Sequence, residues 1–230
     1  MSEKNMTFPY CLPIQCNHAD QVLKNIDRNL DAFSFFEVWL GAVTDLDDDL
    51  LNVLLRLHAP TLIVVLRTKG LEITLPLKRR KFFMHEMAGS PALLDLDITV
   101  QRAEIRYLEK TALPIKTILS YHNYQETPST RKLRSLAASM ATHNASVIKI
   151  ATMCQSPSDA LRLLDLGQEL KAQGREHIVL GMGEHGAVTR IFGTLWGNKM
   201  VFAPRNIALS SAPGQLTRDQ LDSILSILPS

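Results

Sequence analysis

The feature that most constrains the fold is the regular alternation of short apolar runs with stretches of helical periodicity along the whole chain. Eight runs have the β-branched and aliphatic composition of strands, and they cover residues 10–15, 33–40, 61–66, 92–98, 113–121, 146–151, 177–181 and 199–203. Nearly continuous apolar strands are typical of a parallel sheet that is buried on both faces. Eight such units in 230 residues predict a (β/α)8 TIM barrel that forms one domain over residues 1–230.

Helical patterns follow most of these runs and begin near residues 17, 44, 75, 127, 156 and 217. Thr127-Pro128 and Ser156-Pro157 each place a capping residue before a proline at the first helical position, and Thr217 with Gln220 predicts a capping box. No Gly-x-Gly-x-x-Gly follows the first strand, which weakens the alternative of a doubly wound nucleotide-binding sheet.

The composition excludes several classes of protein. Lys and Arg number 25 against 23 Asp and Glu, and the only dense basic run, residues 79–81, is typical of a solvated helix face, so we expect no nucleic-acid partner. No apolar run approaches the ~18 residues of a membrane span. The three cysteines are scattered and predict reduced thiols, without a disulfide framework or a zinc site. We therefore expect a cytoplasmic protein.

Charged side chains recur at the carboxyl ends of the predicted strands, where barrel enzymes place their catalytic groups. These residues are Glu37, Arg67, Asp97, His122 and Lys149, with Arg190 and the loop of residues 211–215 after the last two strands. Structural alternatives remain open for each of them: a lysine paired with a carboxylate, a structural histidine, arginines that form salt bridges between helices, or an aspartate that caps a helix. Their recurrence in successive units favours a common site.

Lys149 carries the most specific chemistry. Burial beside arginines predicts that its pKa falls from the ordinary value of about 10.4. A neutral amine attacks a ketone to form a Schiff base, which acidifies the neighbouring carbon. His122 lies one strand away and is placed to move that proton. Two arginines at the same mouth predict an anionic substrate, most simply a carboxylate, and the set describes an elimination or an aldol-type reaction.

Four segments resemble the signatures of type I 3-dehydroquinate dehydratase. They are Leu-Ser-Tyr-His-Asn at 119–123, Val-Ile-Lys-Ile-Ala at 147–151, Met-Gly at 182–183 with Thr-Arg-Ile at 189–191, and Ser-Ala-Pro-Gly-Gln at 211–215. The resemblance covers residues 10–229 in order and with suitable spacing. It implies a lyase of the shikimate pathway and of aromatic amino acid biosynthesis, which converts 3-dehydroquinate to 3-dehydroshikimate and water.

The resemblance also implies a role for each site residue. Lys149 would form the Schiff base, and His122 would be the general acid and base. It further implies that 3-dehydroquinate is the small-molecule partner and that no metal or organic cofactor takes part. Relatives are often dimers, so a homodimer is the oligomer to test.

For substrate binding, the resemblance implies two groups of side chains. Glu37 and Arg67 would hold ring hydroxyls, while Arg190, Ser211 and Gln215 would hold the carboxylate.

The chain departs from the family pattern in three places. Trp39 stands where the family has a substrate-contacting arginine, two residues after Glu37, and Lys69 is a candidate for the missing cation. Glu72 is shifted by one place from the glutamate expected beside the histidine, and a glycine pair is missing. The chain also begins close to the first strand, so we expect the N-terminal hairpin that plugs the barrel in relatives to be shortened or absent.

Two alternatives compete with an active dehydratase. A class I aldolase also uses a barrel lysine, but the carboxylate-binding loop at 211–215 weighs against it. The other is a weakened or degenerate barrel that binds a related ring carboxylate without turnover, which Trp39 and the displaced Glu72 motivate. Absorbance of a conjugated product on addition of 3-dehydroquinate separates turnover from binding alone.

Overall fold

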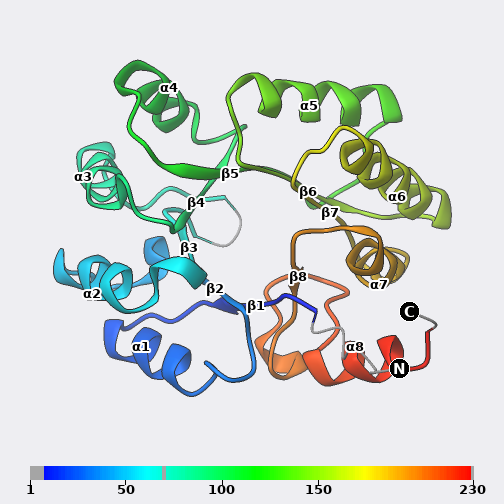
Figure 1. The fold of residues 1–230 in the computed structure, drawn as a ribbon, viewed down its shortest axis with the longest axis horizontal. Helices are drawn as coiled ribbons and strands as arrows, with labels where there is room; N and C mark the ends of the chain where they lie inside the picture. Colours follow the sequence, from blue (N-terminus) through cyan, green and yellow to red (C-terminus); the bar gives the residue numbers. More distant parts are fainter. Residues whose placement is uncertain (1–7, 69–70, 229–230) are drawn as a thin grey trace, which may run out of the picture.

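A computed structural model describes residues 8–68 and 71–228 of the chain. Eight parallel strands form one sheet in the order β7-β6-β5-β4-β3-β2-β1-β8, and it curls into a nearly closed barrel inside a ring of helices (Figure 1). The strands are β1 Tyr10–Ile14, β2 Phe35–Trp39, β3 Leu62–Val65, β4 Leu93–Asp97, β5 Lys116–Asn123, β6 Val147–Met153, β7 His177–Met182 and β8 Val201–Phe202. The predicted TIM barrel is therefore confirmed.

A helix follows each strand of the barrel. The helices are α1 Ala19–Asp27, α2 Asp49–His58, α3 Leu77–Met87, α4 Arg102–Thr111, α5 Thr130–Thr142, α6 Pro157–Ala172, α7 Ala187–Trp196 and α8 Arg218–Leu225. Three short 3-10 turns lie at Leu40–Ala42, Ala59–Thr61 and Ile207–Leu209. The helices α4 and α7 were not predicted from the sequence pattern.

Two helices begin where the capping residues predicted. Pro157 is the first residue of α6, and Asp159 accepts a hydrogen bond from the backbone N–H of Ser156 at 3.2 Å. At α8, the backbone N–H of Thr217 donates to the side-chain oxygen of Gln220 at 2.9 Å, and the backbone N–H of Gln220 donates to the hydroxyl of Thr217 at 3.2 Å. These caps satisfy N–H groups that a helix leaves unpaired at its start.

The predicted start of α5 is wrong by two residues. Ser129 is the N-cap, and its hydroxyl accepts from the backbone N–H of Lys132 at 3.4 Å. Thr127 instead donates its hydroxyl to the carbonyl of Met153, at 2.8 Å. It therefore ties the loop after β5 to the end of β6.

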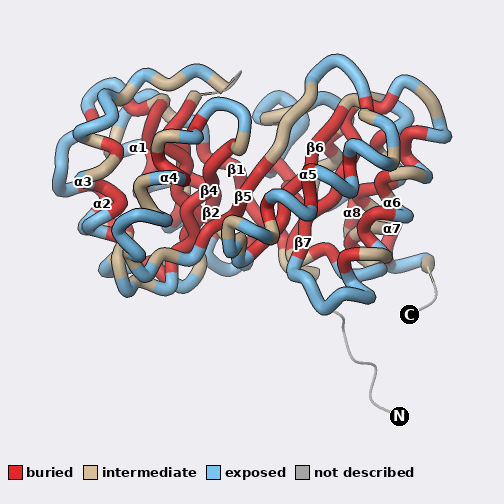
Figure 2. The backbone as a smooth tube through the Cα atoms, turned by 90° about the horizontal axis from the view of Figure 1, so that it is seen from above, coloured by how far each residue is buried: buried red, intermediate tan, exposed pale blue. Residues whose placement is uncertain are grey.

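The inside of the barrel has an apolar layer that all eight strands build. Its members are Cys11, Phe35, Ile63, Leu93, Ile118, Val147, Ile178 and Met200 with Phe202. Side chains two residues apart on a strand share a face. The residues two positions after Phe35, Leu93, Ile118 and Val147 therefore also point inward, and these are Glu37, Asp95, Ser120 and Lys149. Figure 2 shows the strands and the inner sides of the helices as buried.

The barrel has a seam between β7 and β8. In the described part of the chain these two strands are not paired with each other. The side-chain amide of Asn198 takes the place of a strand residue, because it accepts from the N–H of Val179 at 2.9 Å and donates to its carbonyl at 3.1 Å. The N–H of Lys199 also donates to the carbonyl of His177 at 2.8 Å. One side chain thus replaces part of a ladder.

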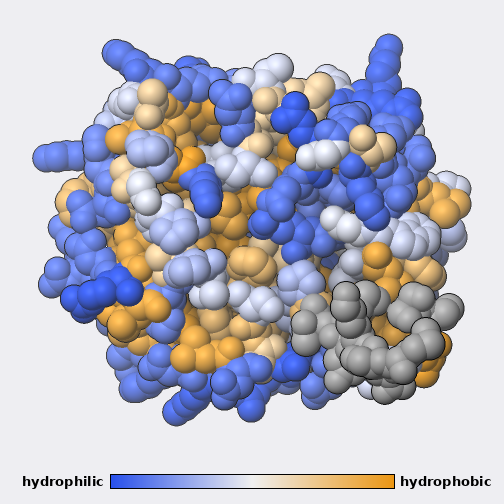
Figure 3. Space-filling model, viewed as in Figure 1, coloured by the Kyte–Doolittle hydropathy of each residue, from blue (hydrophilic) through white to orange (hydrophobic). Residues whose placement is uncertain are grey.

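On the face drawn in Figure 3, most residues around the edge are hydrophilic. No helix of the described residues is long and apolar enough to cross a membrane. The expectation of a shortened N-terminal hairpin concerns residues 1–7, which lie outside the described residues, as does Lys69.

Candidate active site

A pocket opens inside the barrel at the carboxyl ends of the strands, with about 430 Å³ of atom-free space including its mouth. Seven of the residues proposed for the site from the sequence line it: Glu37, Trp39, His122, Lys149, Arg190, Ser211 and Gln215. Arg67, Glu72 and Asp97 are not among the described residues that line it.

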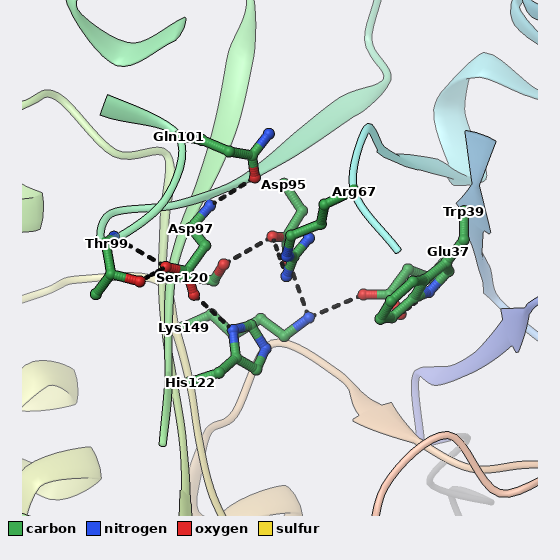
Figure 4. Close-up of polar contacts among 10 residues, drawn as sticks. All are labelled: Glu37, Trp39, Arg67, Asp95, Asp97, Thr99, Gln101, Ser120, His122 and Lys149. Carbon is green, nitrogen blue, oxygen red and sulfur yellow. Dashed lines mark hydrogen bonds and ion pairs between the residues drawn. The ribbon is translucent and has the colours of Figure 1, made fainter. Parts of the chain in front are cut away.

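Lys149 reaches this pocket from within β6. It is the third of seven strand residues, so the prediction that Lys149 lies at the carboxyl end of its strand was wrong. Its Nζ lies 2.8 Å from Oε1 of Glu37 and 2.9 Å from Oδ2 of Asp95 (Figure 4). The ring of Phe202 lies 4.2 Å below the ammonium.

The predicted fall in the pKa of Lys149 is overturned. Burial does lower the pKa, but attraction to Asp95 and Glu37 outweighs it, and the pKa of Lys149 lies above its ordinary value. The resting side chain is therefore an ammonium held by two carboxylates.

Asp95 is the centre of the buried charge network. In addition to its contact with Lys149, Asp95 accepts a hydrogen bond from the hydroxyl of Ser120 at 2.7 Å. It also forms an ion pair with Nη2 of Arg67 at 3.0 Å. Burial raises the pKa of Asp95, yet Lys149 and Arg67 together hold it well below its ordinary value. From the sequence, only Asp97 of this strand was proposed for the site, because it sits at the strand end, and Asp95 was missed.

His122 is held by Asp97. Its Nδ1 lies 2.9 Å from Oδ2 of Asp97, which leaves Nε2 for the pocket (Figure 4). Asp97 is fixed in turn by the N–H of Thr99 at 2.9 Å. Burial lowers the pKa of His122 and outweighs the hydrogen bond to Asp97, so the imidazole is neutral at neutral pH. With Nδ1 donating, Nε2 is the proton acceptor.

The aromatic ring of Tyr124 covers His122 at the mouth, with ring centroids 6.3 Å apart and planes 15° from parallel. Glu72 was named as a possible partner of the histidine, but its side chain is exposed in the loop after β3. In this structure Asp97 takes that position.

Trp39 and Glu37 share the barrel interior, as their spacing predicts. The indole Nε1 donates to Oε2 of Glu37 at 2.8 Å, so both oxygens of Glu37 have a partner, the other being Lys149. The guanidinium of Arg67 lies 5.6 Å from the centroid of the indole. The backbone of Arg67 also passes so close to Gly41 that a Cβ there would lie 2.7 Å from its carbonyl carbon, which only glycine tolerates.

Arg190 of α7 is a buried cation with no hydrogen-bond partner in the part of the chain that the structure describes. Its side chain is 1% exposed, and none of its three nitrogens has a hydrogen-bond partner among the described residues. Burial lowers the pKa of Arg190 to about 10, so it stays charged. An unpaired buried guanidinium that lines a pocket is suited to an anionic ligand.

The loop after β8, which lines the same pocket as Arg190, is built around Gln215. Its Oε1 accepts from the N–H of Ser211 at 2.7 Å, and its Nε2 donates to the hydroxyl of Ser211 at 2.9 Å. Gly214 has φ +74°, and a Cβ there would lie 2.3 Å from the carbonyl oxygen of Gly183. Glycine is therefore required for the turn that brings this loop against the end of β7.

The described residues contain no group of three or more His, Cys, Asp or Glu side chains that could hold a metal ion.

The family comparison agrees with this geometry. A family model described as type I 3-dehydroquinase matches residues 10–230. The chain belongs to the type I 3-dehydroquinase family. A 3-dehydroquinate dehydratase of Klebsiella pneumoniae is 29% identical over an alignment of 245 residues, gaps included, which covers 98% of this chain and 97% of the relative. One of Dehalococcoides mccartyi is 34% identical over 140 residues, which span 60% of this chain and only 62% of that relative's length.

Solved members of the family have the same fold. The 3-dehydroquinate dehydratase of Geobacillus kaustophilus superposes with a TM-score of 0.81 at 23% identity, covering 97% of this chain and 91% of that one. The type I enzyme of Clostridium difficile, crystallised with covalently modified comenic acid, gives 0.80 at 22% identity, covering 96% and 91%.

Proposed function

We propose that this protein is a hydro-lyase that converts 3-dehydroquinate to 3-dehydroshikimate through a Schiff base on Lys149. The observation that carries the proposal is the composition of one pocket. A lysine and a neutral histidine face the same space, and an unpaired buried arginine lines it. Membership of the type I 3-dehydroquinase family supports the same substrate.

Substrate binding begins at the carboxylate. The unpaired guanidinium of Arg190, with the hydroxyl of Ser211 and the amide of Gln215, provides donors for both oxygens of a carboxylate. A ring anchored there extends toward the ammonium of Lys149. Positioning of this kind converts attack on the ketone into an effectively unimolecular step.

Lys149 must lose a proton before it can attack. Glu37, with Oε1 at 2.8 Å, is the nearest acceptor that also lines the pocket. In the proposed step, one N–H bond of the ammonium breaks as the carboxylic O–H of Glu37 forms. The amine then adds to the carbonyl carbon, and loss of water from the carbinolamine gives the imine.

His122 performs the elimination. Nε2 takes the proton from the carbon next to the imine, and the electron pair moves toward the imine nitrogen. The protonated histidine returns the proton to the departing hydroxyl, which leaves as water. Hydrolysis of the conjugated imine releases the product and restores Lys149. The imine accepts the electrons in this sequence, so it requires no metal or organic cofactor.

A second function is a barrel that binds a ring carboxylate without turnover. The observation that favours it is the engagement of both Glu37 oxygens by Lys149 and Trp39, which leaves this carboxylate without a free oxygen for substrate.

Addition of 3-dehydroquinate distinguishes the two functions. A dehydratase produces a rise in ultraviolet absorbance from the conjugated product, and borohydride then leaves a reduced adduct on Lys149. The variant Lys149→Ala is the control for both signals. Binding of 3-dehydroquinate without absorbance or adduct would rule out the dehydratase and leave the ring-acid barrel.

A further inference from the structure

Trp39 determines what one side of the pocket presents to a ligand. Its side chain is 8% exposed and lines the pocket, whereas Arg67 is 1% exposed and does not. The guanidinium of Arg67 lies over the indole, 5.6 Å from the ring centroid. An aromatic surface therefore stands where Arg67 would otherwise face the ligand.

Most polar atoms on this side are engaged, and the two that are not, Nε and Nη1 of Arg67, have no partner among the described residues but are buried beneath the indole and do not line the pocket. The one donor of the indole, Nε1, binds Oε2 of Glu37, and Oε1 of Glu37 binds Lys149. Nη2 of Arg67 is paired with Asp95. A ring hydroxyl placed against Trp39 would meet carbon atoms, and it would lose hydrogen bonds to water without replacing them.

The other polar groups of the pocket remain available. Arg190 has no hydrogen-bond partner within the described ranges, and Ser211 and Gln215 line the same pocket. At the reacting end stand Lys149 and His122. The pocket thus has strong partners for a carboxylate and a ketone, but few for hydroxyls on the Trp39 side.

We propose that Trp39 is a specificity-determining residue, which makes this site select cyclic keto acids by their carboxylate and ketone and tolerate the absence of ring hydroxyls. The substrate class is wider than 3-dehydroquinate and includes keto acids with a less polar ring. The inference rests on the proposed function only for the location of the site, because it concerns binding and not turnover.

Two alcohols that cannot form an imine test the proposal by calorimetry. Quinate has the full set of ring hydroxyls, and 3-hydroxycyclohexane-1-carboxylate has one. We expect their dissociation constants for the native protein to lie within about tenfold of each other, since one charged hydrogen bond gained or lost changes affinity by about ten- to a hundredfold.

Three variants complete the design. Trp39→Ala uncovers Arg67 and frees Glu37. We therefore expect the affinity for quinate, relative to that for 3-hydroxycyclohexane-1-carboxylate, to rise by at least about tenfold. Trp39→Phe keeps a ring over Arg67 and frees only Glu37, so its effect should be smaller. Trp196→Ala removes the exposed tryptophan at the end of α7, which does not line the pocket, and should leave the ratio unchanged.

The outcomes separate the two proposals. A native protein that prefers quinate a hundredfold or more would overturn the role of Trp39, and this result needs no variant to fold. An unchanged ratio in both Trp39 variants would overturn it as well. If the ratios follow the expectation but 3-dehydroquinate gives no conjugated product, the dehydratase fails and the specificity assignment stands. Binding of neither alcohol would overturn the site itself.

Discussion

Replacing Asp95 by asparagine tests how Lys149 is kept in its resting state. The aspartate is fully buried and contacts Lys149, Arg67 and Ser120. Asparagine keeps the shape but removes the charge. An amide N–H that faces Nζ disfavours the ammonium and can donate to the neutral amine. The pKa of Lys149 should therefore fall in Asp95→Asn.

The size of the effect follows from the geometry. Two unit charges 2.9 Å apart, the distance between Nζ and Oδ2, attract by about 6 kcal/mol at an effective dielectric constant of about 20. A quarter of this attraction is enough to move the midpoint of amine deprotonation by about one pH unit, since one unit corresponds to ~1.36 kcal/mol. The same change leaves Arg67 partly unpaired, so we expect a loss of about 3–5 kcal/mol in the free energy of unfolding.

The assay is the pH dependence of imine trapping with cyanoborohydride and 3-dehydroquinate, read as adduct by intact mass. Only the neutral amine reacts, so trapping rises with pH through the pKa of the lysine. A lower pKa moves the midpoint to lower pH. Asp97→Asn is the matched control, because Asp97 lies on the same strand and is buried but pairs with His122. A midpoint in Asp95→Asn that stays in place or moves upward would refute the reasoning.

Three further predictions concern single side chains. Lys149→Ala should give no reduced adduct with 3-dehydroquinate, and an adduct that persists would place the imine elsewhere. His122→Ala should still form the adduct in stopped reactions but turn over ~10²–10⁴ times more slowly; unchanged turnover would show that another group moves the proton. Arg190→Gln should lower kcat/KM by about ten- to a hundredfold, mainly through KM, because it removes a charged hydrogen bond to the carboxylate. An unchanged KM would remove Arg190 from the carboxylate site.

The barrel could be predicted because its strands carry a strong local signal. The helices α4 and α7 were not predicted, because their sequence signals are weak or atypical. In α4, the buried face includes Glu104, which pairs with Arg80 of α3, so a charged residue interrupts the apolar stripe. The N-cap of α4 is Gln101, which is not a preferred capping residue, and α7 begins after Gly186, which has no side chain to accept a capping hydrogen bond. Tertiary contacts decide such elements.

The location of site residues could be predicted where it depends on their place in a strand. Properties that depend on a partner side chain from another part of the chain could not be predicted. Lys149 and His122 were proposed because charged side chains recur toward the carboxyl ends of the predicted strands. The ionisation state of Lys149 could not be predicted in this way, because it depends on Asp95 and Glu37, which come from other parts of the chain. In the same way, the exclusion of Arg67 from the pocket depends on the stacking of Trp39, which no spacing reveals.

The seam between β7 and β8 has a consequence for the mechanics of the barrel. Arg190 follows β7, whereas Ser211 and Gln215 follow β8, so the proposed carboxylate site spans the one junction that strand pairing leaves incomplete in the described structure. A bound carboxylate would connect the two sides of this junction and add its hydrogen bonds to those of Asn198. Ligand binding should then slow amide hydrogen exchange first at the ends of β7 and β8, because the substrate itself would link the two strands that are not paired.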